Sequence, residues 1–370
     1  MRAFHVRLRR AKTILSFWQG GQLVFKNYLT RVTISADPMV SQLLDFFSTW
    51  HTPGDLASQM LEYTNESTHA AVRQLLKYTF LVEEGTREAE LDDLIASEWA
   101  GWLPLAGCFH FGTKDVPYCK SAADIERVLK RLKTESPQPL FSKSYPDVKT
   151  LSLPRPTEHQ REFFRILTTR RTHRRFSSAK LSCTLVSELL YYTWGITGFL
   201  HSRLLGQLPL KTSPSAGARH PIEVYLVSIR VKGLRSGIYH YAAHRHHLEQ
   251  LRVGKMEDRA ALYCADQSWV KNAAALFLMT AMFPRVMWKY RSARAYRTVL
   301  LDAGHLCQTF CLTATSLGLA PFCTMAFRDT LIEKDLAVDG IGESVLYVAG
   351  VGVPCEDNSF KLRSRFSASL

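Results

Sequence analysis

The sequence lacks the features that mark secreted, membrane-spanning and disulfide-stabilised proteins. Its eight cysteines form no C-x-x-C pair and lie mostly beside apolar residues, as expected of reduced thiols in a cytosol. The longest nearly unbroken apolar run, Ala273–Phe283, has 11 residues, whereas a helix needs about 20 to cross a bilayer. The basic N-terminus leads into no continuous apolar segment of the kind found in secretory signals. We therefore expect a soluble, cytoplasmic protein with no membrane partner.

Acidic residues are scarce as well, but only in the C-terminal part of the chain. The 370 residues carry a net charge of +14, with 18 basic against 17 acidic residues in 1–150 and a net charge of +13 in 151–370. A basic protein invites a nucleic-acid hypothesis. The third helix expected in the N-terminal segment, where a DNA reader needs cations, offers only Arg73 and Lys77. A nearly neutral segment gains little from counterion release, so we expect no nucleic-acid partner.

Residues 1–95 form the first of three expected segments. A strand-like stretch, Gln22–Ile34, precedes helical patterns, and Thr52–Asp55 has the cap, first-turn proline and acid of a helix start. A third helical pattern ends in Leu81–Gly85. A strand, three short helices and a wing resemble a winged helix, and more closely the leader-peptide recognition modules of peptide-modifying enzymes. A purely structural cap for the rest of the chain remains an open alternative.

Residues 96–155 are interpreted as a proline-rich linker around a short basic helix, Ala122–Leu132. Residues 156–370 then alternate helical and strand patterns. Helices are expected at His159–Thr169, Leu185–Trp194 and Tyr296–Leu317, and strands at Ile222–Ile229, Leu276–Ala281 and Val345–Ala349. This order predicts an α+β domain with an antiparallel-rich sheet flanked by long helices.

Four short stretches of residues 156–370 stand out for their chemistry. Thr212–Pro221, T-S-P-S-A-G-A-R-H-P, has almost no side-chain bulk, so its backbone can approach a flat ligand closely. Arg170–Phe176 groups arginines, which bind phosphate through bidentate, charge-assisted hydrogen bonds. Trp288–Tyr290 places a lysine between two aromatic residues, and Lys361–Arg363 adds a C-terminal basic pair.

In this order and spacing, the four stretches, together with Gly350–Pro354 before the C-terminal basic pair, resemble the nitroreductase-like flavoproteins, and within them the SagB-type dehydrogenases. Those enzymes use FMN to oxidise azoline rings to azoles in modified peptides. The resemblance runs from about Trp102 to the C-terminus and includes Phe109–Asp115 and Gly237–Tyr241. It implies a nitroreductase-like FMN-binding fold in residues 156–370, preceded by the small winged-helix-like domain. It also implies a homodimer in which each of two FMN sites draws on both subunits.

The resemblance assigns cofactor contacts to two groups of residues. The phosphate group comprises Arg170, Arg171, Thr172, Arg174, Lys361 and Arg363. The ring group comprises Pro214, Ser215, Ala216, Gly217, Arg219 and Gln308. Ordinary nitroreductases usually carry Asn and Gln further along the turn, where this chain has Ala218, Arg219 and His220. This departure matches the SagB-type branch.

Lys289 and Tyr290 are the expected catalytic residues. Oxidation of an azoline removes a Cα proton and delivers hydride to flavin N5, so a base must face the flavin. Lysine beside tyrosine meets this need if each shifts the pKa of the other in a dry pocket. In the resembling oxidases, a Lys-Tyr dipeptide in this region is catalytic. From spacing alone, the competing interpretation is an amphipathic loop in which Lys289 faces water.

The expected function is therefore that of an FMN-dependent oxidase acting on a modified peptide or a related natural product, with oxygen reoxidising the flavin. A cyclodehydratase, which makes azolines, is the expected partner in a complex. One alternative is an NAD(P)H-dependent reductase of nitro compounds or quinones. Another is a peptide-binding partner whose catalysis has decayed.

No metal site is expected. Cys307 and Cys311 lie four residues apart on a predicted helix near His305, but their apolar neighbours indicate core positions. Four further histidines fit a strand–turn–strand that points them to different faces, without an acid or cysteine to complete a ligand set. These histidines are His240, His244, His246 and His247.

Overall fold

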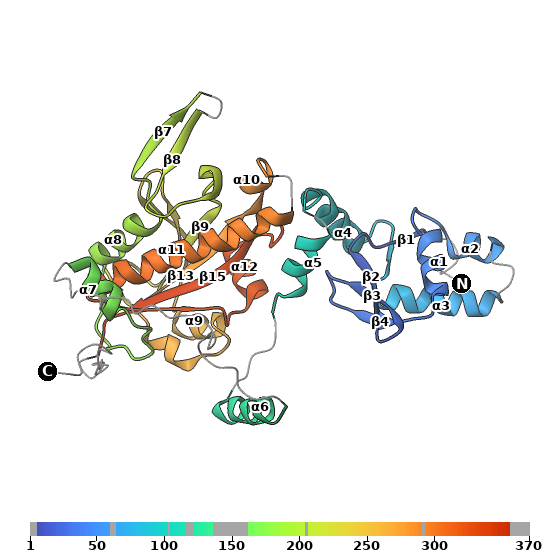
Figure 1. The fold of residues 1–370 in the computed structure, drawn as a ribbon, viewed down its shortest axis with the longest axis horizontal. Helices are drawn as coiled ribbons and strands as arrows, with labels where there is room; N and C mark the ends of the chain where they lie inside the picture. Colours follow the sequence, from blue (N-terminus) through green and yellow to red (C-terminus); the bar gives the residue numbers. More distant parts are fainter. Residues whose placement is uncertain are drawn as a thin grey trace, which may run out of the picture. The chain divides into compact units, whose positions relative to one another are not determined.

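The computed structural model describes residues 6–59, 64–102, 104–115, 121–135, 162–203, 206–290 and 293–355. The chain divides into two compact units (Figure 1). Unit 1 comprises Met1–Lys114, Met282–Val299 and Ile341–Glu343. Unit 2 comprises Asp115–Ala281, Leu300–Gly340 and Ser344–Leu370. Unit 1 thus draws on three separate stretches of the chain.

Unit 1 combines small antiparallel sheets with short helices. Its described elements are β1 (Leu8–Arg10), β2 (Ile14–Gln19), β3 (Gln22–Asn27), β4 (Thr33–Ser35), α1 (Met39–Phe46), α2 (Pro53–Gln59), α3 (Asn65–Lys77), β5 (Leu81–Glu83), α4 (Arg87–Glu98), α5 (Leu105–Gly112), α10 (Phe283–Met287) and η4 (Ala293–Ala295). β3 pairs with β2 and β4, and β1 pairs with β5. The core between them includes Phe25, Leu44, Phe47, Leu75 and Phe80.

The stretch predicted as one strand, Gln22–Ile34, is two strands joined by a turn. Asn27 Oδ1 accepts hydrogen bonds from the backbone N–H groups of Leu29 at 3.0 Å and Thr30 at 3.2 Å. Arg31 then adopts a φ of 64°. An asparagine side chain that bonds the backbone after it favours a turn over a continuing strand. The single-strand prediction was therefore wrong.

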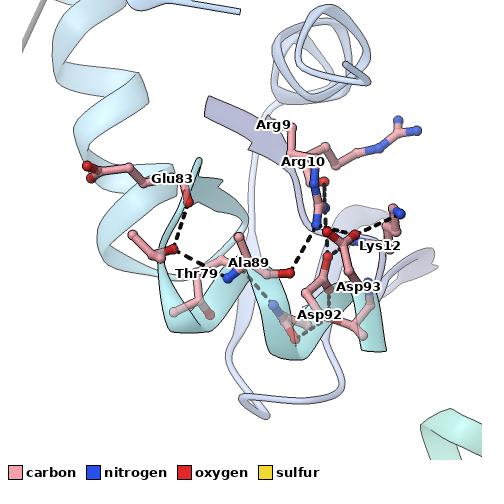
Figure 2. A network of polar contacts seen from close by, with 11 residues as sticks. Arg9, Arg10, Lys12, Thr79, Glu83, Ala89, Asp92 and Asp93 are labelled. Atoms are coloured by element: carbon pink, nitrogen blue, oxygen red, sulfur yellow. Dashed lines mark hydrogen bonds and ion pairs between the residues drawn. The ribbon is translucent and has the colours of Figure 1, made fainter. Parts of the chain in front are cut away.

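A buried ion pair joins β1 to α4 (Figure 2). Arg9 Nη1 donates to Asp92 Oδ2 at 2.7 Å, and the two side chains are 5% and 2% exposed. Arg9 Nη2 donates to Asp93 Oδ1 at 2.7 Å. Asp92 also accepts hydrogen bonds from the backbone of Lys12 and from the backbone and hydroxyl of Thr13. Removing Arg9 would leave the buried carboxylate of Asp92 without its ion-pair partner, so the pair holds β1 in place on α4.

Part of the expected linker, residues 96–155, is folded into unit 1. Trp99 and Trp102 are both 0% exposed, and α5 follows them. α6 (Ala122–Glu135) covers the expected basic helix and belongs to unit 2. Residues 116–120 and 136–155 lie outside the described part of the chain. The boundary of the N-terminal unit therefore falls at Lys114 rather than at residue 95.

Unit 2 is built on a six-stranded sheet of order β12-β11-β9-β13-β15-β14. Its described elements are α6, α7 (Glu162–Thr169), β6 (Leu181–Ser182), α8 (Cys183–Trp194), β7 (Gly198–Ser202), β8 (Gly206–Leu210), η2 (Ala216–Ala218), β9 (Ile222–Ser228), β10 (Val231–Lys232), β11 (Gly237–Ala242), β12 (His247–Val253), α9 (Glu257–Tyr263), η3 (Ser268–Asn272), β13 (Ala275–Met282), α11 (Tyr296–Ser316), β14 (Ala320–Thr324), α12 (Asp329–Leu336) and β15 (Glu343–Gly352). The terminal residues of β13, α11 and β15 belong to unit 1.

The pairings of β9 with β11 and β13, of β11 with β12, and of β14 with β15 are antiparallel. The predicted strands at Ile222, Leu276 and Val345 are confirmed as β9, β13 and β15, and α8 and α11 occupy the predicted helical ranges. The prediction of an α+β domain with an antiparallel-rich sheet is therefore correct.

Helices cover both faces of this sheet. Phe277 of β13 packs on Trp194 of α8 and Phe310 of α11, with ring centroids 5.5 and 4.9 Å away. Leu276 and Leu278, which point to the other face, belong to a buried cluster that includes residues of α9 and α12. Figure 1 shows α11 running along the sheet. The long helix α11 thus contributes to the core on one face of the sheet.

In the part of the chain that the structure describes, no helix has both the length and the apolar character needed to cross a bilayer.

Candidate functional site

The turn Thr212–Pro221 connects β8 to β9 and is bound to the helices beside it. Ser213 Oγ and Thr309 Oγ1 of α11 lie 2.7 Å apart, within hydrogen-bonding distance. Thr212 Oγ1 donates to the carbonyl oxygen of Tyr192 in α8 at 2.8 Å. The small hydroxyl side chains of Thr212 and Ser213 therefore anchor the turn to α8 and α11.

Asp302 of α11 organises the middle of this turn. Ser215 Oγ donates to Asp302 Oδ2 at 2.5 Å and accepts a hydrogen bond from the backbone N–H of His220 at 2.9 Å. The N–H of Ala216 also bonds the carboxylate of Asp302. Asp302 is 5% exposed, and its burial raises its pKa above the ordinary value against the lowering effect of these bonds. Sequence reasoning missed Asp302, because one acid on a long amphipathic helix carries no local signal.

The backbone of the turn adopts unusual conformations. Gly217, Ala218 and His220 have φ values of 60°, 54° and 44°. Such values are free of strain for glycine but cost energy at Ala218 and His220, so the contacts around them must hold them there. Arg219 Nε donates back to the carbonyl of Gly217 at 2.9 Å. The expected ring group from Pro214 to Gly217 thus lies in one rigid, tightly curved segment.

The arginine segment, residues Arg170–Phe176, lies along the ends of β14 and β15. The N–H of His173 donates to the carbonyl of Pro321, and the N–H of Ser177 donates to the carbonyl of Val353, both at 2.9 Å. Phe176 packs against Trp269 and Phe322 with ring centroids 6.3 and 5.8 Å away. These contacts fix the direction of the chain from Arg170 onward.

The individual arginines in this segment differ in their surroundings. Arg171 Nη1 donates to the carbonyls of Thr168 and Arg170, so this side chain closes the end of α7. The guanidinium of Arg174 lies 5.8 Å from the ring centroid of Trp269, with the side chain exposed. Burial, and then the charge of Arg170, lowers the pKa of His173. At neutral pH, the positive charge of the segment therefore comes from its arginines.

The structure brings the expected residues together in groups. The phosphate candidates Arg170, Thr172 and Arg174 share the segment beside β14, whereas the turn lies against α11 near Asp302 and Thr309. Gln308 is exposed on α11, one residue before Thr309. Lys361 and Arg363 lie outside the described residues, which reach Cys355.

Lys289 and Tyr290 follow α10 in unit 1. The N–H groups of both residues donate to the carbonyl of Val286, at 3.1 and 2.9 Å, so the dipeptide continues the last turn of this short helix. Lys289 is exposed, and its Nζ lies 5.4 Å from the ring centroid of the half-buried Tyr290. The two side chains are therefore neighbours, as a cooperating pair requires, but the exposure of Lys289 matches the competing amphipathic-loop interpretation rather than a dry pocket.

The tryptophans of the expected linker support this dipeptide. Trp102 Nε1 donates to the carbonyl of Tyr290 at 3.2 Å. Trp99 packs against Phe283 with centroids 5.0 Å apart, and Trp102 packs against Tyr296 at 5.8 Å. Aromatic contacts thus involve residues both before and after the Lys289-Tyr290 dipeptide in the chain. Sequence reasoning missed this support, since the partners lie far apart in the chain.

Comparisons with known proteins give a family and several relatives. A family model described as the nitroreductase family matches residues 167–353. The trifolitoxin-processing protein TfxB of Rhizobium leguminosarum is 32% identical over 171 residues, which cover 45% of this chain and 46% of TfxB. MJ1384 of Methanocaldococcus jannaschii, which bears the name of a nitroreductase, is 30% identical over 173 residues, covering 47% of this chain and 83% of MJ1384. The alignment with TfxB thus spans about half the length of that relative.

Two solved structures with detectable similarity to this chain differ in how much of each chain is aligned. The E. coli microcin synthetase McbBCD complex, with truncated pro-MccB17 bound, contains a chain 20% identical, covering 72% of this chain and 93% of its own, with a TM-score of 0.46. A protein of Anabaena variabilis that bears the name of a nitroreductase is 25% identical, covering 52% of this chain and 38% of its own, with a TM-score of 0.44.

Proposed function

Because this chain belongs to the nitroreductase family, we propose that it is an FMN-dependent oxidase of a modified peptide or a related natural product. The proposed reaction converts an azoline ring to an azole. The observation that carries the choice of substrate is the 32% identity to a trifolitoxin-processing protein. It agrees with the SagB-type order of the arginine segment, the Thr212–Pro221 turn and the Lys289-Tyr290 dipeptide.

The residues of unit 2 suit the two ends of FMN. Arg170 and Arg174, with the hydroxyl of Thr172, offer cationic and hydrogen-bonding donors for a phosphate dianion, and Lys361 and Arg363 would add to them. The turn at Pro214–Gly217 offers closely curved backbone with small side chains for the edge of the ring. Asp302 of α11 stabilises the shape of this turn by accepting the hydrogen bond from Ser215. We propose these residues, with Arg171, Arg219 and Gln308 at their margins, as the cofactor site.

The proposed chemistry assigns the proton to Lys289 and Tyr290. When bound, FMN would supply a two-electron acceptor for this oxidation, with oxygen as the terminal acceptor. The azoline loses one hydride and one proton, and the proton must go to a base of the protein. Lys289 Nζ beside the Tyr290 ring offers an amine and a phenol as neighbours, so one group can take the proton while the other holds the substrate. The bond from Trp102 fixes the backbone that carries them.

We further propose that unit 1 contacts the peptide outside its reacting ring. A concave surface of this unit is lined by β1, β2 and α1, and its polar side chains include Arg10, Lys12, Ser16, Ser41 and Ser48. Such a surface suits an extended peptide with acidic and amide groups. In this proposal, residues 1–95 act as a winged-helix-like domain that recognises the leader peptide. The protein forms a homodimer, and a cyclodehydratase is the partner that supplies the azoline.

The test is anaerobic reduction of the flavin by candidate electron donors. We expect purified protein to be yellow, with about one FMN per chain. Mixed without oxygen with an azoline-containing peptide, its flavin absorbance near 450 nm should bleach while the azole accumulates in equal amount. NADH and NADPH serve as the comparison donors. Colourless protein that also fails to take up added FMN would contradict the proposal.

The second candidate function is an NAD(P)H-dependent reductase of nitro compounds or quinones. The 30% identity to MJ1384, over 83% of that protein, favours it. Rapid bleaching by NADPH, with no bleaching by azoline peptides, would select this function. A peptide-binding partner without catalysis is the third candidate, and it requires that neither donor reduce a bound flavin.

A further inference from the structure

Three cysteine side chains converge at the C-terminal half of α11. The Sγ atoms of Cys307, Cys311 and Cys323 all lie within 4.8 Å of one another. Cys307 and Cys311 are buried, at 3% and 4% exposure, and Cys323 is half-buried. The first two were expected to be ordinary core residues, and the third was not connected with them from the sequence. The cluster has no part in the proposed flavin chemistry.

The fold accounts for this convergence. Cys307 and Cys311 are four residues apart on α11 and therefore point to the same face of the helix. Gly318, with a φ of 69°, ends the helix and turns the chain back into β14. A strand advances about 3.3 Å per residue and a helix about 1.5 Å, so four residues of returning strand reach back along about nine residues of helix. Cys323 consequently lies level with the two helical thiols.

We propose that Cys307, Cys311 and Cys323 bind a single thiophilic divalent metal ion, for which Zn²⁺ is the natural candidate. Zinc–sulfur bonds of about 2.3 Å in tetrahedral arrangement separate the sulfur atoms by about 3.8 Å. The observed upper limit of 4.8 Å means that an inward shift of about 1 Å suffices. Soft thiolate ligands select zinc and related ions over magnesium or calcium. Three protein ligands leave a fourth position for water or a small ligand.

The groups around the thiols suit a metal-bound thiolate cluster. Tyr347 Oη donates to Cys323 Sγ at 3.3 Å, the kind of outer hydrogen bond that orients a metal ligand. Three thiolates around a divalent ion carry a net charge of −1. The positive charge of Arg170 interacts electrostatically with Cys311 and Cys323, so it offsets the negative net charge of such a cluster. Cys323 is only half-buried, so it is the thiol through which a metal ion can enter the cluster.

Cobalt binding tests the proposal, with Co²⁺ as the spectroscopic probe for Zn²⁺. The full chain is reduced, stripped with a chelator and titrated with Co²⁺ in the absence of oxygen. We expect one Co²⁺ per chain, with the near-ultraviolet thiolate-to-cobalt band and visible bands of tetrahedral cobalt, and displacement by Zn²⁺. Cys323→Ser should abolish the thiolate band. Tyr347→Phe, which keeps the three ligands, should weaken binding by about 10–100-fold.

Two other cysteines provide matched controls. Cys264 is fully buried and Cys183 is exposed, and neither belongs to the cluster. Cys264→Ser and Cys183→Ser should bind cobalt as the parent chain does. Equal cobalt spectra in all variants, or no thiolate band in the parent chain, would overturn the proposal.

A measurement without variants guards against a failure to fold. Mass spectrometry after brief alkylation of the parent chain should show that Zn²⁺ protects the half-buried Cys323, whereas the exposed Cys183 is alkylated equally with and without Zn²⁺. Unchanged alkylation, or a disulfide between Cys323 and a helical thiol that forms despite Zn²⁺, would also overturn the metal site.

Discussion

Ser215 donates a 2.5 Å hydrogen bond to Asp302, a carboxylate that is only 5% exposed on α11. The same hydroxyl accepts the N–H of His220, so one serine closes the turn and ties it to the helix. The positive φ values at Gly217 and Ala218 are held by this arrangement. The shape of the proposed ring-binding turn is therefore set by a residue 87 positions further along the chain than Ser215.

We expect Asp302→Ala to weaken FMN binding. The substitution removes the acceptor of Ser215 and Ala216, and a hydrogen bond to a charged group contributes about 1.5–3 kcal/mol. Asp302→Asn keeps one acceptor oxygen and should lose less. Fluorescence titration of stripped protein with FMN measures both variants. Equal affinity for FMN in Asp302→Ala and the parent protein would show that the turn keeps its shape without the carboxylate.

The raised pKa of Asp302 predicts a pH dependence of stability. A carboxyl whose pKa is higher when folded favours the protonated form, so its contribution to the free energy of unfolding is full below its ordinary pKa of 3.8. That contribution falls as pH rises through the folded pKa. Stability of the parent protein should therefore fall relative to Asp302→Asn as pH increases from 4. Urea unfolding of both proteins across this range measures the difference, and a difference that stays constant would contradict the shift.

Arg174→Ala should weaken FMN binding by about 1.5–3 kcal/mol, or roughly 10–150-fold. The exposed guanidinium of Arg174, placed over Trp269, is proposed to bind the phosphate. Arg175→Ala, a neighbouring exposed arginine outside the proposed site, is the control and should bind FMN normally. Riboflavin, which lacks the phosphate, should bind the parent protein and Arg174→Ala equally. If riboflavin shows the same loss as FMN, the arginine does not act on the phosphate.

Lys289→Ala and Tyr290→Phe should keep FMN bound but lower turnover by about 10²–10⁴, the usual share of general acid–base catalysis. The two residues follow α10 and belong to neither the arginine segment nor the turn. Flavin content and single-turnover bleaching by substrate are measured on the same preparations. Bleaching at full rate in both variants would remove the dipeptide from the mechanism.

Trp102→Phe should lower turnover without loss of flavin. It keeps an aromatic ring but removes the donor to the Tyr290 carbonyl, which frees the backbone beside Lys289. A loss of about 1.4 kcal/mol in positioning corresponds to about a tenfold lower rate. Trp99→Phe is the matched control, because its indole donates to the carbonyl of Ile341 at 3.1 Å. Both variants should melt at lower temperature, and only Trp102→Phe should lose turnover per flavin; equal losses of turnover would contradict a specific role.

Local sequence signals predicted the elements that depend on neighbouring residues. The helix start at Thr52 is confirmed, since the N–H of Asp55 donates to Thr52 Oγ1 and the N–H of Thr52 donates back to Asp55. β13 was visible as an apolar run because both of its faces are buried.

Features that depend on distant residues were not predictable in this way. Prolines and loop-like composition indicated a linker at residues 96–155, yet Trp99 packs on Phe283, almost two hundred positions away. Cys323 joins Cys307 only because the chain reverses at Gly318. Asp302 became recognisable as a support of the turn only once its partners Ser215 and Ala216 were placed in space.

The three-part composition of unit 1 bears on how chimeric enzymes should be built from relatives of this chain. Trp99, Trp102, Phe283 and Tyr296 pack as one set of rings, although the tryptophans lie far from the other two residues in the sequence. A crossover after Lys114 would combine Trp99 and Trp102 from one parent with Phe283 and Tyr296 from the other. Packing in a protein core is sensitive to a change of a single methylene group. Chimeric chains should therefore fold more reliably when Met1–Lys114, Met282–Val299 and Ile341–Glu343 are exchanged together.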